Sequence, residues 1–86
     1  MNEPVNEKVS VVSSYNRMKG VIIPRKMRWQ GKDYLIQKLS YYHKRRIGKE
    51  TFHVFDVTDG TTDFRLVCNP ENLHWTLEEV SDGLAH

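Results

Sequence analysis

The stretch that decides the fold is residues 52–68, which read FHVFDVTDGTTDFRLVC. Asp59-Gly60 stands between two runs of β-branched and aromatic residues, and this dipeptide is the strongest short-range signal for a β-hairpin with a type I′ turn. With these two residues as the turn, His53 is expected opposite Leu66. Counting by twos places an apolar set on one face of the hairpin, namely His53, Phe55, Val57, Thr62, Phe64, Leu66 and Cys68. The stretch predicts two antiparallel strands with one buried face.

A second hairpin is predicted in residues 25–36, with Gln30-Gly31 as its turn. This register places Arg28 opposite Asp33 and gives one face to four large side chains, Met27, Trp29, Tyr34 and Ile36. Pro24, just before the hairpin, is expected to mark an edge or a kink, because proline has no N–H to donate to a neighbouring strand.

The region after this hairpin has a less regular pattern. Its alternation slips within residues 34–43, which indicates a bulge or a strand bent between two layers. Residues 43–50, HKRRIGKE, are predicted to form a solvated loop with a strongly basic tip. The loop would join the bent strand to the one that begins near Thr51.

The two ends of the chain are less clear. Asn69-Pro70 could cap a helix over residues 70–82 or make a tight turn before a strand in which Leu73, Trp75 and Leu77 alternate with polar residues. We favour the strand, because a helix would turn Trp75 away from the two leucines. An N-terminal strand is expected over residues 8–13, with the first six and last four residues outside the ordered core.

Length and composition agree with one small all-β domain. The chain has 86 residues, of which 38% are hydrophobic, and a single cysteine, which excludes an internal disulfide framework. Its longest apolar run, residues 21–23, is far too short to cross a bilayer, so we expect a cytoplasmic protein without a membrane partner. We predict one domain over residues 1–86, ordered from about 8 to 82. It would be an antiparallel meander of five or six strands curling into a half-open barrel of the SH3 or OB type, with the C-terminal helix as the alternative.

The net charge of +2 hides a division along the chain. Residues 1–50 hold twelve Lys and Arg against four acids, which gives +8, and residues 51–86 hold Arg65 against seven acids, which gives −6. Such asymmetry is typical of a surface that meets nucleic acid or another polyanion, but an acidic strand beside a basic one in the sheet would produce it too. The arrangement of the charges in space decides between the two.

The sequence offers little for catalysis. It contains no glycine-rich phosphate loop and no nucleophile motif. His43, His53, Cys68 and His74 lack the close spacing of zinc ligands, and in the predicted register His53 and Cys68 are offset along their strands. We therefore expect no enzyme, no metal and no cofactor.

Several of these residues form a recognisable pattern: Trp29-Gln-Gly31, Tyr34, Asn69-Pro70-Glu71 and Trp75-Thr-Leu77-Glu. The pattern resembles a small bacterial β-domain family of unknown function. Some members of that family are associated with proteins similar to lesion-bypass DNA polymerases, so the resemblance implies a nucleic-acid setting. No catalytic residue carries over from it. The basic segment and the hairpin over residues 52–62 depart from the family's pattern.

Binding is the function that the residues favour. The candidate contacts to nucleic-acid phosphates, with one aromatic side chain for stacking, are Arg25, Lys26, Arg28, Tyr42, Lys44, Arg45, Arg46 and Lys49. Lys32 and Lys38 are secondary candidates. Tyr41 and its neighbour Tyr42 are expected on opposite faces of one strand. The alternative is a protein–protein adaptor or a homo-oligomer, in which the basic half docks on an acidic protein surface or on a second copy of the chain.

Overall fold

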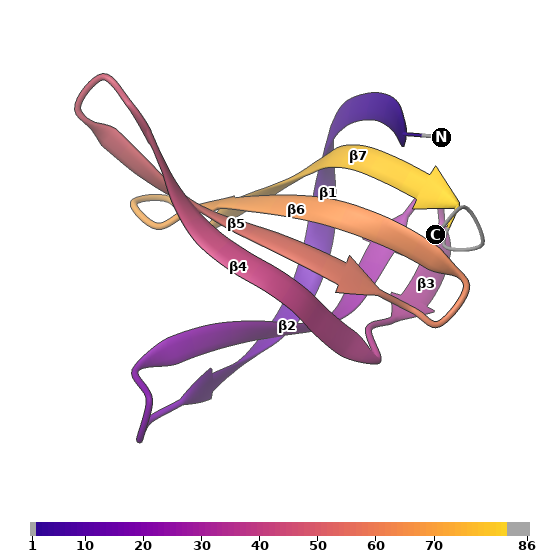
Figure 1. The fold of residues 1–86 in the computed structure, drawn as a ribbon, viewed down its shortest axis with the longest axis horizontal. Coiled ribbons are helices and arrows are strands. Elements are labelled where there is room, and N and C mark those ends of the chain that lie inside the picture. The colour runs from indigo at the N-terminus through magenta and orange to yellow at the C-terminus, as the bar shows by residue number, and fades with distance from the viewer. Residues whose placement is uncertain (1, 83–86) are drawn as a thin grey trace.

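Seven antiparallel strands form one sheet in the computed structural model, which describes residues 2–82 (Figure 1). The strands are β1 (Asn2–Asn16), β2 (Val21–Trp29), β3 (Lys32–Leu35), β4 (Lys38–Ile47), β5 (Glu50–Thr58), β6 (Thr62–Asn69) and β7 (His74–Asp82). Their order across the sheet is β3-β2-β1-β7-β6-β5-β4. The prediction of an antiparallel all-β fold is confirmed, with seven strands in place of five or six. The predicted single meander is wrong, because β1 pairs with β7 and the consecutive strands β3 and β4 lie at the two ends of the sheet. The described residues contain no helix, so the alternative of a C-terminal helix is wrong, and no helix that could span a membrane is present among them.

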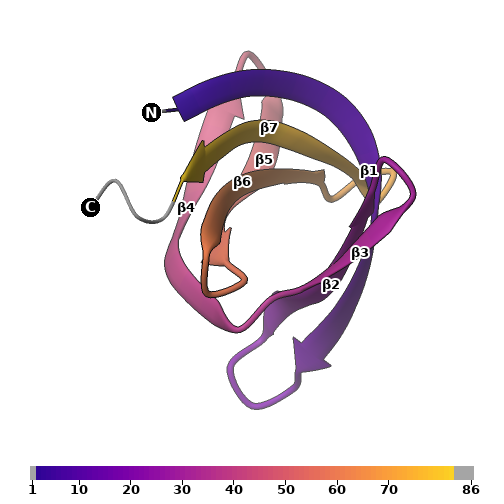
Figure 2. The same cartoon turned by 90° about the vertical axis from the view of Figure 1, so that its right-hand side faces the viewer.

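The sheet is open at β3 and β4 but curls until these two ends approach each other (Figure 2). The two residues between β3 and β4 join its ends, because Ile36 N donates to the Arg25 carbonyl of β2 and Gln37 N donates to the Thr58 carbonyl of β5. A short link therefore bridges strands from opposite sides of the sheet. The finer likeness to SH3-type or OB-type scaffolds stays a prediction.

The β2–β3 hairpin follows the predicted register. Gln30 and Gly31 have φ values of 52° and 74°, as a type I′ turn requires, and Arg28 pairs with Asp33. Next to Pro24, the β1–β2 pairing shifts its register between Val12 and Ser13, which fits the expected irregularity. In the bent segment, β4 has a second irregularity between Leu39 and Tyr41, where the alternation of the sequence slips.

The β5–β6 hairpin has the predicted faces but a different register. His53 pairs with Cys68 rather than Leu66, so the strands are displaced by two residues from the predicted register. The turn is wider than two residues because the Asp59 carboxylate accepts bonds from Thr61 N at 2.9 Å and Thr62 N at 2.8 Å. A displacement of two residues leaves every side chain on its predicted face.

The predicted basic loop over residues 43–50 is wrong. Strand β4 continues to Ile47, a two-residue turn follows at Gly48-Lys49, and β5 begins at Glu50. Gly48 has a φ of 61°, which makes so tight a turn feasible. The basic residues therefore stand on a regular hairpin in which alternate side chains face opposite ways.

Both ends of the chain form strands. Residues 70–73 make a turn before β7, in which Trp75 and Leu77 are buried as predicted, whereas Leu73 lies in the turn and is exposed. Strand β1 begins at Asn2, so the expectation that the first six residues lie outside the fold is wrong. The predicted loose ending, residues 83–86, lies outside the described residues.

The core lies on the concave side of the curled sheet. It consists of Met27, Phe55, Val57, Phe64, Leu66, Cys68, Trp75 and Leu77. Val54 is buried on the opposite, convex face, where it pairs with His43 and Val67. Since cross-strand partners share a face, the pairing tells which polar side chains lie on each side of the sheet.

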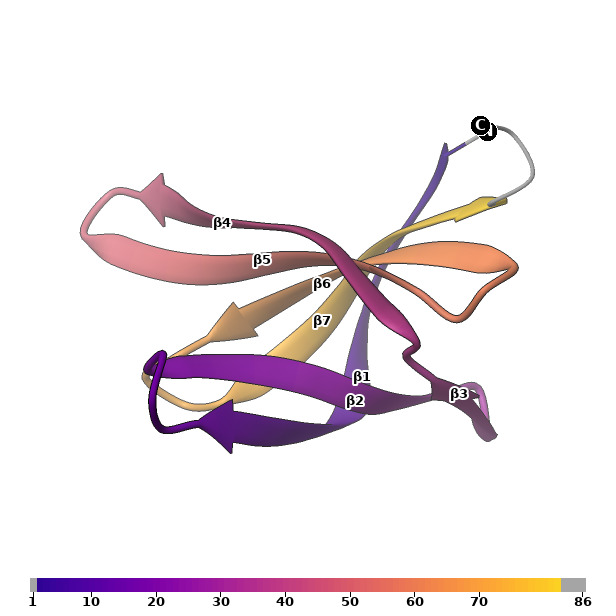
Figure 3. The ribbon, with the colours of Figure 1, turned by 60° about the horizontal axis from the view of Figure 1, so that its bottom comes forward.

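Three hairpin turns lie at the same end of the sheet, at the left of Figures 1 and 3, and are spread apart from one another. They are the β1–β2 turn (residues 17–20), the β4–β5 turn (48–49) and the β6–β7 turn (70–73). We call this the three-turn end. In Figure 1 the β1–β2 and β4–β5 hairpins diverge towards it, with the β6–β7 turn between them in that view.

Candidate nucleic-acid interface

The cations of β4 alternate between the two faces of the sheet. From Tyr41 to Ile47 the strand pairs with β5 without interruption, and Tyr42 lies opposite the buried Phe55. Lys44 and Arg46 follow at steps of two and share the concave face with Tyr42. Both cations are exposed, because this part of the hairpin extends beyond the core. The concave face of β4 thus carries one tyrosine followed by two free cations.

The β1–β2 hairpin lies across from this face of β4 at the three-turn end (Figure 1). Its turn forms because Asn16 Oδ1 accepts bonds from Met18 N at 3.0 Å and Lys19 N at 3.1 Å, and Gly20 closes it with a φ of 66°. The tyrosine before the turn, Tyr15, pairs with Ile22 and is 64% exposed. An aromatic ring and a cation therefore stand on this hairpin as well.

A groove of about 320 Å³ lies between these two hairpins. It is lined by Tyr15, Lys19, Gly20, Val21, Ile22, Ile23, Leu39, Tyr42, His53 and Phe55, and we call it the tip groove. Phe55 is 3% exposed, so the lining extends down to the core of the protein, whereas Tyr15 and Lys19 are exposed. The tip groove is mostly apolar inside and cationic where it opens.

Tyr42 and His53 form the polar part of the tip groove. The Tyr42 hydroxyl is 2.5 Å from His53 Nδ1, and the two rings are stacked with their centroids 5.8 Å apart. Burial, followed by the positive charge of Lys44, lowers the pKa of His53, and burial raises the pKa of Tyr42. Both groups are therefore neutral at pH 7, and with the ring proton on Nε2 the hydroxyl donates to Nδ1.

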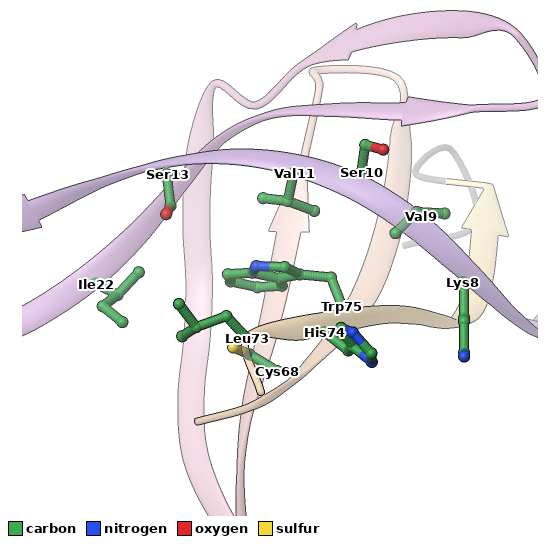
Figure 4. Close-up of a pocket in the computed structure, with 10 residues that line it drawn as sticks. All are labelled: Lys8, Val9, Ser10, Val11, Ser13, Ile22, Cys68, Leu73, His74 and Trp75. Carbon is green, nitrogen blue, oxygen red and sulfur yellow. The ribbon is translucent and has the colours of Figure 1, made fainter. Parts of the chain in front are cut away.

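A second hollow, of about 550 Å³, lies beneath β1 (Figure 4). Trp75 lies in its middle, between Val11 of β1 and the side chains of Leu73 and Cys68. Ile22 lines both hollows, so they adjoin. Burial raises the pKa of the Cys68 thiol, which keeps it protonated and makes it a poor nucleophile.

The convex face carries most of the ion pairs. Arg45 donates two hydrogen bonds to the Glu78 carboxylate, at 2.6 and 3.0 Å. Arg65 binds Asp56 at 2.8 Å and Glu79 at 3.0 Å. Hydrogen bonding to Arg45 lowers the pKa of Glu78. Arg65 thus neutralises acids of its own half of the chain on the neighbouring strands β5 and β7, and the Arg45–Glu78 pair joins the basic half to the acidic half across β5 and β6.

The structure divides the eight predicted site residues. Tyr42, Lys44, Arg46 and Lys49 lie on the β4–β5 hairpin at or near the three-turn end. Arg45 lies on the convex face and is bound to Glu78. The remaining three, Arg25, Lys26 and Arg28, stand further from that end along β2.

The three predicted residues of β2 have other partners. Arg25 donates to the Ser14 hydroxyl at 2.9 Å, and Arg28 binds Asp33 at 3.3 Å. Lys26 is half-buried and pairs with Val12 and Leu35. The structure therefore does not bring these residues to the tip groove.

Sequence reasoning missed Tyr15, Arg17, Lys19 and His53 as members of this region. Arg17 and Lys19 lie in the β1–β2 turn, and the signal that could have identified that turn was the pair Asn16 and Gly20, four residues apart before a β-branched strand. Nothing local in the sequence indicates that this turn lies near β4, because the two hairpins are brought together by the pairings of β1, β7, β6 and β5 and by the link at Ile36 and Gln37.

The described residues contain no group of three His, Cys, Asp or Glu that could hold a metal ion. His53 and Cys68 are direct cross-strand partners, not offset as the predicted register implied. His53 is half-buried and lines the tip groove, where Tyr42 occupies its Nδ1, whereas Cys68 is buried in the core.

No family model, curated protein or solved structure matches the chain.

Proposed function

We propose that this protein is a non-catalytic nucleic-acid-binding module, acting in the cytoplasm, whose three-turn end holds phosphates. The observation that carries the proposal is the free charge on the two hairpins that line the tip groove, with Lys19 in the lining itself. Arg17 and Lys19 stand on one hairpin, and Lys44, Arg46 and Lys49 on the other. Within residues 3–81, none of these five has a carboxylate within 4 Å.

The charge at the three-turn end stays positive when its acids are counted. Glu50 follows the β4–β5 turn and Glu71 lies in the β6–β7 turn, so five cations face two carboxylates. Three further acids of β5 to β7, Asp56, Glu78 and Glu79, bind arginines on the convex face. Unpaired cations at one end of a protein attract the phosphates of a nucleic acid. When these phosphates are bound, the counterions condensed on the nucleic acid are released, which favours binding.

The test is a salt series of fluorescence-anisotropy titrations with labelled single-stranded and duplex oligonucleotides. In the variant Lys44→Ala/Arg46→Ala/Lys49→Ala, three phosphate contacts are lost. We expect the slope of log K against log salt concentration to fall in magnitude by about 2 for the single strand and by about 2.7 for the duplex, with affinity reduced at least about tenfold at low salt.

A matched control removes the same charge elsewhere. Lys26→Ala/Arg28→Ala/Lys32→Ala also loses three cations, all near the β2–β3 hairpin. We expect this variant to retain the wild-type slope to within about 0.5. Equal weakening of both variants would show that only net charge matters, and absence of binding by the wild type at low salt would overturn the proposal. Anionic vesicles serve as a further competitor, and preference for them over both oligonucleotides would also overturn it.

Association with a protein is the second candidate, and the free edge of β4 is the observation that favours it. This ten-residue strand pairs only with β5 among the described strands, and it exposes Tyr41 and Ile47. An unpaired edge can add a strand from an acidic partner or from a second copy. Sedimentation velocity at low and high ionic strength tests self-association. A monomer under both conditions rules it out.

A further inference from the structure

We infer that the tip groove accepts an unpaired base of a single-stranded nucleic acid, between rings supplied by the two hairpins. This inference rests on the proposed function and names the class of ligand. It starts from Tyr15, which is 64% exposed beside an apolar groove and forms no ring contact with another aromatic among the described residues.

The opposite wall is also aromatic, but its rings are held in place. Tyr42 packs on Phe55 with ring centroids 5.0 Å apart and is stacked with His53. These rings form an aromatic wall on the β4–β5 hairpin, and Tyr15 with its cross-strand partner Ile22 lines the groove from the β1–β2 hairpin. Planar bases stack on such rings with little regard to sequence, because every base has a π face.

The groove also has polar groups suited to the edge of a base. After the contact between the Tyr42 hydroxyl and His53 Nδ1, the hydroxyl oxygen can still accept a bond and the neutral histidine can donate from Nε2. Lys19 on one side and Lys44 on the other are placed to hold the phosphates that flank the inserted base. The lining thus offers stacking, hydrogen bonding and charge in the arrangement that one nucleotide needs.

A duplex cannot use the same lining. Its bases are paired and stacked within the helix, so they reach a recessed ring only after unpairing, which costs a few kcal/mol. A duplex therefore presents only phosphates to the cations at the opening of the groove. Single strands, whose bases are free to leave the stack, contact both the cations and the rings.

The experiment compares three labelled ligands of one length with the full chain at fixed salt: oligothymidylate, the same backbone with abasic sites, and a duplex. We expect oligothymidylate to bind about tenfold or more tightly than either of the others. The variant Tyr15→Ala should lose that advantage and leave the affinity for the abasic strand unchanged. Tyr41→Ala removes a tyrosine of 60% exposure from the convex face of β4 and should change neither affinity.

The outcomes separate the inference from the proposed function. If all three ligands bind equally well, or if Tyr15→Ala and Tyr41→Ala weaken binding to the same degree, the groove takes no base and the inference is overturned, while phosphate binding stands. If no ligand binds, the proposed function fails. Because Tyr15 and Tyr41 are both exposed, circular dichroism is expected to show that both variants keep the wild-type fold.

Discussion

Lys44, Arg45 and Arg46 are consecutive cations with different surroundings. Arg45 lies on the convex face, where its guanidinium makes a two-bond ion pair with Glu78 and is 31% exposed. Lys44 and Arg46 lie on the concave face without a carboxylate partner among the described residues. The sequence predicted that all three bind phosphates, because a run of basic residues indicates positive charge but does not indicate which of the side chains form ion pairs within the protein. Only the position of Glu78, thirty-three residues away, removes Arg45 from that set.

At the same scale, His53 makes the stability of the protein depend on pH. Burial and the charge of Lys44 lower the pKa of His53 in the folded protein below its ordinary value of about 6.5. Between those two pKa values the unfolded chain binds more protons, so acidification favours unfolding. We expect the free energy of unfolding, measured in urea, to fall as pH drops from about 7 through 6.5 and to level off below the folded-state pKa.

Two variants isolate the histidine. His53→Gln should show no such fall over this range, and Lys44→Gln should show a smaller one, because it removes the second cause of the shift. A wild-type stability that rises on acidification, or an unchanged profile in His53→Gln, would contradict the assignment.

At the scale of the strands, local signals predicted some hairpins well. Gln30 and Gly31 form a two-residue turn that needs two positive φ angles, and glycine adopts one of them at no steric cost. Both the turn and the strand register could therefore be predicted from the sequence. The β4–β5 hairpin was mistaken for a loop, because Lys44 and Arg46 stand at the core-facing positions of β4 where apolar side chains are expected. Beyond the core that face meets solvent, and the alternation disappears from the sequence while the strand continues.

The β5–β6 turn shows how a side chain overrides a dipeptide signal. Asp59 Oδ1 accepts bonds from the backbone N–H groups of Thr61 and Thr62 and from the Thr61 hydroxyl. We predict that Asp59→Ala lowers the free energy of unfolding by about 1–2 kcal/mol, since it leaves these donors without their acceptor. Asp59→Asn keeps a side-chain oxygen and should cost less than half as much. Urea unfolding at neutral pH measures both, and equal losses would show that the charge of Asp59, and not its hydrogen bonds, holds the turn.

At the scale of the whole molecule, the charged side chains that make up the net charge of +2 are distributed unevenly over the curled sheet. Asp56, Glu78 and Glu79 neutralise Arg45 and Arg65 on the convex face, whereas the cations of two hairpin ends stay free beside the tip groove. Alternation could place Tyr41 and Tyr42 on opposite faces, and the structure confirms this. It could not bring Tyr15 near Tyr42, because that meeting depends on the pairings of all the strands from β1 to β4 across the sheet and on the link that joins its ends at Ile36 and Gln37.

The set of residues that a bound single strand protects from hydrogen exchange therefore tests whether both hairpins take part in binding. Hydrogen exchange at short times reports local opening, which is easiest at the ends of hairpins and at edge strands. With saturating oligothymidylate, we expect slower exchange in residues 15–22 and in residues 42–53 together, because both hairpins line one groove. Residues 26–35 should exchange as in the free protein, since they lie away from the groove at the β2–β3 hairpin. Protection confined to the β4–β5 hairpin would mean that this hairpin binds phosphates alone, and that the approach of the two hairpins in the curled sheet has no part in binding.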